Sequence, residues 1–216
     1  MHMTKGAIAL AALLALAVPS RAAESQAEIE AGFARTVLSK TEGGWTWFDI
    51  GNHGDLVHKP SGLACRQNLS DSERVVIKVL DPKEGQDFYC EYVFQQLGRF
   101  TVFATKMPAG MTQDDLFPLV QLSLREELPD PKPAPSPQAI AVTDDSLGLA
   151  VTPLTAAYQT TFQGRYFYSG VWLGVVDGWA IKVHASYITP EQARGEKLAQ
   201  ELFDIAVRTV KAAPQS

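Results

Sequence analysis

The side chains most able to do chemistry are concentrated in one short stretch, His53–Cys65, which reads HGDLVHKPSGLAC. It holds two imidazoles, a carboxylate, an amine, a hydroxyl and a thiol, which are the groups that ligate metals, transfer protons or act as nucleophiles. We take His53, Asp55, His58 and Lys59 as candidate binding residues, because polar side chains gathered near the edge of a sheet could contact a small ligand or a partner protein.

A metal site is one chemistry that these residues could perform. Two histidines five positions apart in an extended segment do not place both rings on one side of a strand. Zinc sites need three or four ligands, and the only histidine later in the chain is His184. A metal-dependent envelope hydrolase that uses His53, His58 and His184 is therefore our alternative function, whereas the leading interpretation expects no metal ligand and no cofactor.

Nucleophilic catalysis is the second chemistry to weigh. Ser61 lies in Pro-Ser-Gly, which has turn composition, and the chain contains neither a Gly-x-Ser-x-Gly elbow nor a Gly-x-x-x-x-Gly-Lys phosphate loop. The simplest interpretation is structural: the Pro-Ser-Gly segment turns the chain, Leu63 packs inward, and Cys65 ties the loop to a strand. The lack of catalytic motifs favours a protein that is not an enzyme.

The chain has two cysteines, Cys65 and Cys90. In an exported protein an even count favours a disulfide, whereas redox pairs have their cysteines close in sequence, as in Cys-x-x-Cys. A bond between Cys65 and Cys90 would contribute roughly 3 kcal/mol in the chain-entropy model. We therefore expect a structural disulfide.

Residues 1–22 have the composition of a secretory signal peptide. Lys5 precedes an apolar run rich in alanine and leucine, which ends in small residues that suit a signal peptidase. We predict cleavage near Ala22 and, because the run looks bacterial, a soluble periplasmic protein without a membrane span in the mature chain. The net charge of −5 becomes −7 once Lys5 and Arg21 are removed, which argues against nucleic acid as a partner.

The first part of the mature chain predicts a helix followed by strands. Apolar residues at every fourth position, Ile29, Phe33 and Val37, predict an amphipathic helix over 25–39. Aromatic and β-branched runs then predict a strand at 45–50 and an antiparallel meander of three strands at 73–80, 87–94 and 99–107.

Two proline-containing segments follow. A second helix is predicted to begin at Asp115 as N-cap and to end near Glu127, since Pro118 is tolerated only in a first turn. Residues 129–137, PDPKPAPSP, have proline at every second position, so they can form neither a helix nor an inner strand. We interpret them as an extended connector within one domain that covers 23–216.

The rest of the chain predicts strands and a closing helix. Asp177-Gly178 lies between two β-rich runs and predicts a two-residue hairpin turn, whose central residues both have positive φ. That turn fixes the register, with Gly174 opposite Ile181, and the glycine would allow another element to pack closely. Strands are predicted at 139–143, 154–162, 165–176 and 179–187, and a helix from Thr189, as N-cap, to about Lys211.

The element order predicts an α+β fold in which helices cover an antiparallel sheet. The run HKPSGLAC, the strands around Cys90 with FATKMP, and the run SGVWLGVVDGWAIKVHASY resemble a group of uncharacterised exported proteobacterial proteins. The element order is similar to the PsbP-like fold of the photosystem II extrinsic protein P. That resemblance implies a central antiparallel sheet between helices and a non-catalytic role, although fold analogy alone does not assign function.

These observations predict a soluble periplasmic binding or interaction protein without catalysis. Its partner would be an envelope protein or a small ligand, and its site would lie where GNHGDLVHKP approaches a sheet edge. A subunit that stabilises a larger envelope assembly is a third hypothesis.

Overall fold

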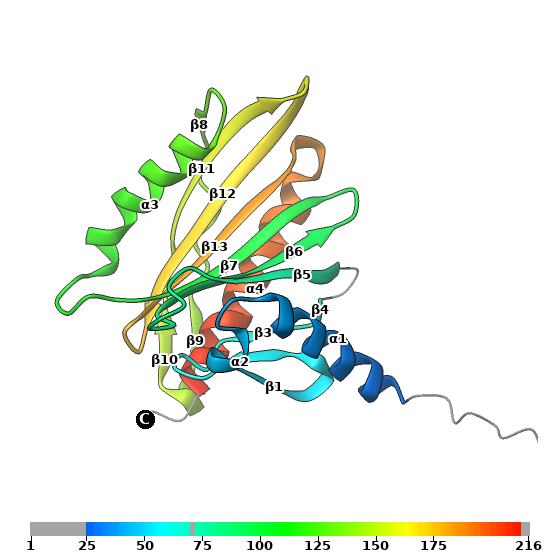
Figure 1. Cartoon of the computed structure of the whole chain (residues 1–216). Helices are drawn as coiled ribbons and strands as arrows, with labels where there is room; N and C mark the ends of the chain where they lie inside the picture. Colours follow the sequence, from blue (N-terminus) through cyan, green and yellow to red (C-terminus); the bar gives the residue numbers. More distant parts are fainter. Residues whose placement is uncertain (1–24, 70–71, 213–216) are drawn as a thin grey trace, which may run out of the picture.

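The computed structural model describes residues 25–69 and 72–212. Within this part of the chain the main element is an eight-stranded antiparallel sheet in the order β4-β5-β6-β7-β13-β12-β11-β8 (Figure 1). The predicted α+β class, with an antiparallel sheet and a long C-terminal helix, is confirmed. In chain order the strands are β4 (Asn68–Leu69), β5 (Ser72–Val79), β6 (Asp87–Phe94), β7 (Gly98–Lys106), β8 (Lys132–Ala134), β11 (Leu154–Phe162), β12 (Arg165–Val176) and β13 (Trp179–Ile188).

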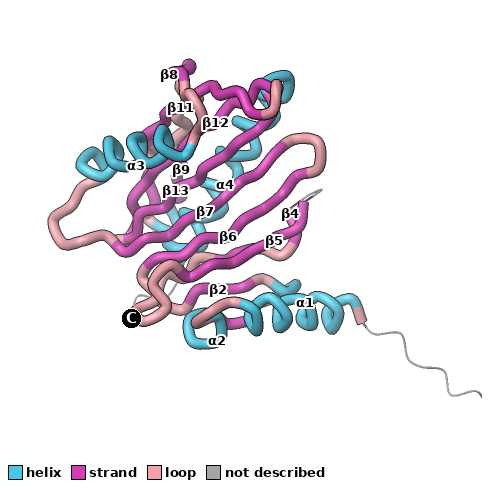
Figure 2. The backbone as a smooth tube through the Cα atoms, turned by 45° about the horizontal axis from the view of Figure 1, so that its top comes forward, coloured by secondary structure: helices cyan, strands magenta, loops and turns pink. Residues whose placement is uncertain are grey.

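Helices and two small sheets surround the large sheet. The helix α4 packs on one face of β12 and β13, α3 packs on the other face over β11 and β12, and α1 and α2 lie beside the β5 edge (Figure 2). The helices are α1 (Gln26–Lys40), α2 (Gly44–Trp47), α3 (Gln113–Glu127) and α4 (Gln192–Ala212), with short 3-10 turns η1 (Asn52–Gly54), η2 (Asp145–Leu147) and η3 (Thr189–Glu191). The small sheets join β1 (Phe48–Ile50), β2 (Leu56–His58) and β3 (Ala64–Cys65), and β9 (Val142–Asp144) and β10 (Leu149–Val151).

The face of the large sheet beneath α4, which we call the covered face, holds the main core. Two glycines let the helix and the sheet approach each other there, and the close packing predicted at Gly174 is present. A Cβ at Gly174 would lie 2.6 Å from the ring of Phe203, and a Cβ at Gly195 would lie 2.5 Å from the ring of Tyr187. Both rings are fully buried, so the two glycines set the distance between α4 and the sheet.

The β12–β13 hairpin forms as predicted. Asp177 and Gly178 both have positive φ, 48° and 77°, and Gly174 lies opposite Ile181. The predicted meander is also present as β5, β6 and β7. The expected disulfide joins Cys65 of β3 to Cys90 of β6, with 5.9 Å between the Cα atoms, and so ties the small sheet to the covered face.

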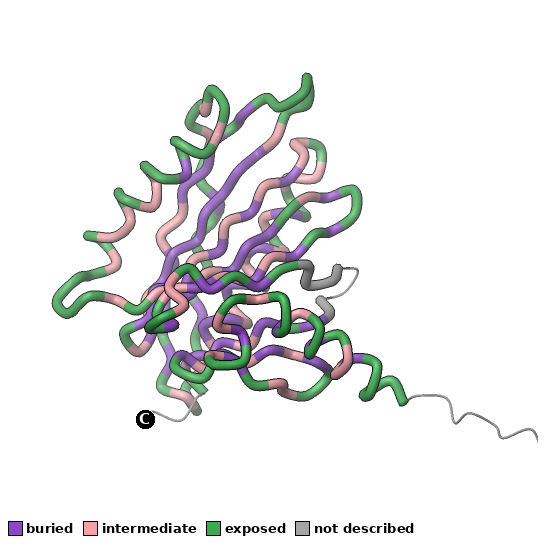
Figure 3. The backbone as a smooth tube through the Cα atoms, in the orientation of Figure 1, coloured by how far each residue is buried: buried purple, intermediate pink, exposed green. Residues whose placement is uncertain are grey.

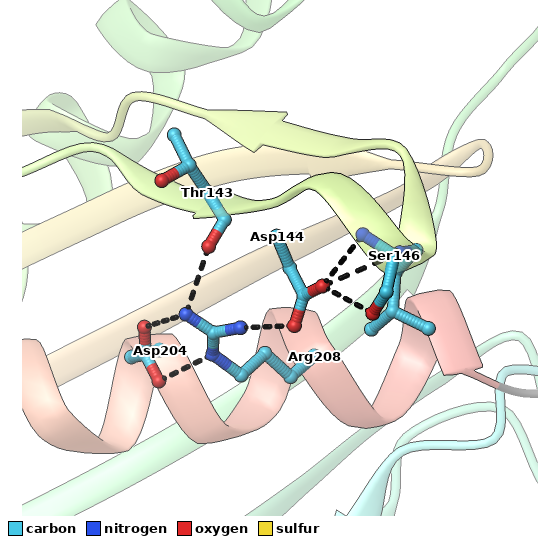
Figure 4. A network of polar contacts seen from close by, with 6 residues as sticks. Thr143, Asp144, Ser146, Asp204 and Arg208 are labelled. Carbon is cyan, nitrogen blue, oxygen red and sulfur yellow. Dashed lines mark hydrogen bonds and ion pairs between the residues drawn. The ribbon is translucent and has the colours of Figure 1, made fainter.

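A polar network holds the β9–β10 hairpin against α4 (Figure 4). Arg208 of α4 donates from Nη1 to Asp144 at 2.7 Å, from Nε to Asp204 at 2.8 Å, and from Nη2 to the carbonyl of Thr143 at 3.1 Å. Asp144 in turn accepts from the backbone and hydroxyl of Ser146. The guanidinium fork thus fixes one small sheet at the C-terminal end of α4.

The segment predicted as a strand at 45–50 begins with a helical turn instead. Gly43, with φ of 71°, admits the turn, and residues 44–47 form α2 before β1 starts at Phe48. The indole of Trp47 donates to the carbonyl of Pro82 at 2.9 Å and lies against Gly85. A tertiary contact therefore outweighs the strand preference of the aromatic residues.

The start of α3 differs from its prediction. Thr112, not Asp115, is the N-cap, and Asp115 is the third residue of a capping box in which it accepts from the Thr112 backbone. Pro118 therefore lies beyond the first turn, where it is exposed and removes one backbone hydrogen bond from the helix. The helix tolerates this loss because its solvent side leaves the freed carbonyl accessible to water.

The proline-rich segment is more than a connector, because its residues 132–134 form β8 at the edge of the large sheet beside β11. Side-chain hydroxyls fasten the segment: Thr155 donates to the carbonyl of Pro137, Thr160 to that of Pro129, and Tyr168 to that of Pro135. Proline at alternate positions offers no N–H to a further strand, so the segment also closes this sheet edge.

Two details of the helices also differ from expectation. The predicted stripe of α1 is largely exposed at Ile29 and Phe33, and the residues that α1 buries include Ala34 and Leu38. The chain enters α4 through η3, so Thr189 lies inside that turn and does not cap α4.

In 25–69 and 72–212 we find no helix whose length and apolar character would let it cross a membrane. The predicted signal peptide lies outside the described residues.

Candidate functional site

The residues singled out from the sequence lie in separate environments. His53, at the turn η1, has a side chain that is 86% exposed, and its Nδ1 lies 3.6 Å from a carboxylate oxygen of Glu30 in α1. Its backbone is left-handed, with φ of 54°. Asp55 accepts from the backbone N–H of Gln67 at 2.8 Å. Lys59 donates to the carbonyls of α2 at Trp45 and Thr46, at 3.2 and 3.0 Å.

His58 is a core residue. Its ring lies 4.1 Å from the ring of Phe88 and 5.6 Å from that of Trp179, measured between centroids. The Ser61 backbone N–H donates to Nδ1, so the neutral ring carries its proton on Nε2, which makes no well-formed hydrogen bond within the part of the chain that the structure describes. Burial lowers the pKa of His58 to about 4, although the nearby Gly85 backbone opposes the shift.

His184 lies on the opposite face of the large sheet. Along β13, Trp179, Ile181 and Val183 point to the covered face, and Lys182 and His184 point to the other. His58 packs against Trp179 on the covered side, so the sheet separates it from His184. His53, His58 and His184 are therefore not brought together, and among the described residues no group of three metal-ligating side chains forms.

The face away from α4, which we call the outer face, has two halves. Beneath α3 it is apolar, with Ala156, Val171 and Leu124 packed together. Over β6, β7 and β13 it carries polar and aromatic side chains in register. One row across the strands holds Tyr89, Phe103 and Lys182, the next Glu91, Thr101 and His184, and the third Val93, Arg99 and Ser186.

Lys182 lies where the two halves of the outer face meet. Its Nζ is 3.8 Å from the centre of the Phe103 ring, and within the described part of the chain it makes no hydrogen bond. Burial lowers the pKa of Lys182, while the charges of Glu127 and Asp87 oppose the shift. Burial also raises the pKa of Asp87, although a hydrogen bond from Thr105 counters it. An ammonium group on an aromatic ring, without an oxygen acceptor, suits an incoming carbonyl or carboxylate.

Two open hollows follow one another along α3. The first, about 210 Å³, is lined by one end of α3 and by Lys182; the second, about 600 Å³, is lined by the other end of α3 and by Ser186. We call them together the α3 groove. Figure 3 shows that α3 stays exposed along much of its length. The first hollow is lined by Thr105, Leu116, Leu119, Val120, Ser123, Leu173, Ala180 and Lys182, and the second by Glu126, Glu127, Leu128, Pro129, Thr160, Phe162, Phe167 and Ser186.

A hydroxyl pair and an imidazole meet at the wall of the groove. The Ser169 hydroxyl lies 2.8 Å from His184 Nε2 and 2.8 Å from the Ser186 hydroxyl, and burial lowers the pKa of His184 to about 4, with the Lys182 charge as a second cause. Ser169 is fully buried, and no carboxylate contacts the ring among the residues described. The trio therefore satisfies its own polar groups and lacks the orienting acid of a serine hydrolase.

The sequence did not reveal the α3 groove, because its residues come from one helix and four strands spread over more than eighty positions. One local signal points toward it: along the second strand of the hairpin that Asp177-Gly178 predicts, Lys182, His184 and Ser186 alternate with apolar residues and so share one face.

Comparisons with known proteins do not assign this chain to a family. No protein-family model and no curated protein matches the sequence. Among solved structures, the fold is similar to LpqN, described as involved in cell envelope biogenesis of Mycobacterium tuberculosis. The TM-score is 0.38 at 13% identity, over 63% of this chain and 76% of that one. Likeness at this level carries no argument about function, and the resemblances to the PsbP-like fold and to exported proteobacterial proteins stay predictions.

Proposed function

We propose that this chain is a periplasmic binding or interaction protein that holds its partner in the α3 groove. The observation that carries the proposal is the outer face, where partly buried polar and aromatic side chains lie beside a helix with exposed leucines. Leu119 and Leu122 of α3 are 56% and 51% exposed. Exposed apolar side chains beside a hollow with a few convergent polar groups are typical of binding sites.

The charges of the groove support binding rather than catalysis. Lys182 and the carboxylates of Glu126 and Glu127 lie along one groove, where they could fix the orientation of a partner. The histidine nearest the groove is engaged with two hydroxyls. Export to the periplasm rests on the composition of residues 1–22, and the disulfide suits an oxidising compartment.

The test is cross-linking in the compartment that holds the protein, followed by purification of the tagged full chain and quantitative mass spectrometry. Leu119→Glu is compared with Ile140→Glu, because Ile140 is 51% exposed and lies outside both hollows. We expect a specific cross-linked partner to fall at least tenfold in Leu119→Glu and to persist in Ile140→Glu. A partner that both variants keep, or that both lose, contradicts the proposal.

The loop residues His53, Asp55 and Lys59 remain a second proposed surface, without His58, which is buried in the core. His53 is the most exposed of the candidate side chains, and it can be changed without disturbing the core. A His53→Ala variant that loses the same partner, while Leu119→Glu retains it, would move the site to this loop.

A further inference from the structure

The α3 groove extends along α3. Its lining residues on α3 run from Leu116 to Glu127, and eleven helical steps span about 16 Å. An extended peptide advances about 3.3 Å for each residue, so the groove matches the length of about five residues.

One end of the groove suits a cation. Glu126 and Glu127 line it together with the rings of Phe162 and Phe167. Glu127 accepts from the Ser123 hydroxyl at 3.1 Å, and no Lys or Arg is ion-paired with either carboxylate among the described residues. Carboxylates beside aromatic faces stabilise guanidinium and ammonium groups by ion pairing and cation–π contact.

The other end suits an apolar side chain, and the middle suits a hydrogen-bond acceptor. Leu116, Leu119 and Leu173 line the first hollow. Lys182 lies at its floor with its ammonium group on the Phe103 ring, where the carbonyl groups of a peptide backbone could accept its hydrogen bonds.

The net charge of the chain favours some classes of extended ligand over others. The protein carries a charge of −5, so its long-range field attracts a basic partner and repels an acidic one. A fatty acid would meet Leu119 at one end, but its carboxylate could pair only with Lys182 and would leave Glu126 and Glu127 without a cation.

We infer that the α3 groove binds an extended segment of a partner protein that carries a basic side chain about four residues from an apolar one. The basic side chain lies between Phe162, Phe167 and the two glutamates, and the apolar side chain lies among the leucines near Lys182. This inference rests on the proposed function, since it names the chemistry of the partner held in the same groove.

The test is an NMR titration of the ¹⁵N-labelled mature protein with defined peptides. The probes are acetylated, amidated Leu-Ala-Ala-Ala-Arg, its reverse sequence, and both peptides with Glu in place of Arg. We expect one arginine peptide to shift the amide signals of α3 and β13, with at least tenfold tighter binding than its glutamate counterpart. The double variant Glu126→Gln/Glu127→Gln should weaken that binding about tenfold.

A matched control is Glu84→Gln/Glu201→Gln, which removes two exposed carboxylates away from the groove and should leave the affinity unchanged. Equal binding of the arginine and glutamate peptides, shifts confined to other elements, or no shifts at millimolar peptide would overturn the inference. Tighter binding of decanoate at the same amides would overturn it in favour of a lipid. If the Leu119→Glu test succeeds and the peptides fail, the groove binds a partner of other chemistry.

Discussion

Each face of the large sheet contacts a histidine, but the surroundings of the two imidazoles differ. On the covered face, His58 is surrounded by Phe48, Phe88 and Trp179, and its Nε2 forms no good hydrogen bond with any described residue. On the outer face, His184 has its Nε2 bonded to Ser169 and lies in a row with Thr101 and Glu91, next to the row of Lys182. The covered face holds the fold together by apolar contact, whereas this part of the outer face combines apolar contact with hydrogen bonds between polar side chains.

This difference locates the surface that is free to bind. A polar or aromatic side chain on a covered face is explained by packing or by a hydrogen bond. On the outer face, the ammonium group of Lys182 lies on the ring of Phe103 and lines a hollow beside α3, and both side chains are only partly buried. The predictions below test whether the two faces differ as described.

The strongest contrast is within a single strand, β7. Phe100 points to the covered face and is fully buried against Phe94 and Tyr187, whereas Phe103 points to the outer face. We expect Phe100→Ala to lower the free energy of unfolding by about 3–5 kcal/mol, because it leaves a cavity. Phe103→Ala should cost about 1 kcal/mol in the same urea titration. Equal losses would show that the outer face is as tightly packed as the covered one.

The histidines should make the fold sensitive to mild acid. Their pKa is about 4 in the folded protein and 6.5 in the unfolded chain. The stability from keeping the rings neutral is therefore fully present above pH 6.5 and is lost as the pH falls toward 4. Each ring can account for up to about 3 kcal/mol. Urea unfolding measured from pH 7.5 to 4 should show this decline.

His184→Gln separates the two contributions, because glutamine can still bond to Ser169 but does not titrate. The variant should remove about half of the decline between pH 6.5 and 4. A pH profile that matches the wild type would mean that His184 is not buried in the neutral form.

The disulfide belongs to the covered face, where it ties the loop before β4 to β6. Replacing Cys65 and Cys90 together by alanine should cost roughly 3 kcal/mol of unfolding free energy, since the bond closes a loop between cysteines 25 positions apart. The partner affinity of the folded variant should stay unchanged, because neither cysteine lines the α3 groove. A change in affinity without a change in stability would connect the loop to the binding site.

The smallest effect is expected at the start of α3. Thr112→Ala removes the N-cap hydroxyl and should cost about 1 kcal/mol. Hydrogen–deuterium exchange should speed up in α3 while α4 keeps its protection. Acceleration throughout the sheet would mean that α3 is part of the main core and not a cover for half of the outer face.

Local signals in the sequence predicted the elements that depend on neighbours in the chain. The β12–β13 hairpin follows from Asp177-Gly178, since two residues with positive φ fix both the turn and the register. The disulfide follows from the cysteine count. In contrast, α2 depends on the hydrogen bond from Trp47 to Pro82. The position of the proline-rich segment 129–137 depends on hydroxyl groups of β11 and β12. No local sequence pattern predicts these contacts, because the partners are far apart in the chain.

The α3 groove could not be predicted for the same reason. Its charged residues, Glu126 and Glu127 of α3 and Lys182 of β13, lie more than fifty positions apart in the sequence and belong to no motif. The side chains of the polar stretch His53–Cys65 do not form one site. His58 lies in the core, Lys59 donates hydrogen bonds to α2, and His53 is exposed. Polar residues close in sequence mark a shared site only when the backbone turns them to the same side.

The most direct test of the central claim is site-specific photo-cross-linking within the exported compartment. A photoreactive phenylalanine replaces Leu119 in the groove or His53 in the loop, one position at a time, in the full chain. The account predicts a discrete adduct from position 119 that is missing from position 53 and that disappears when Lys182 is changed to Glu. An adduct from position 53 alone would contradict it and would place the binding surface at the loop between β1 and β2.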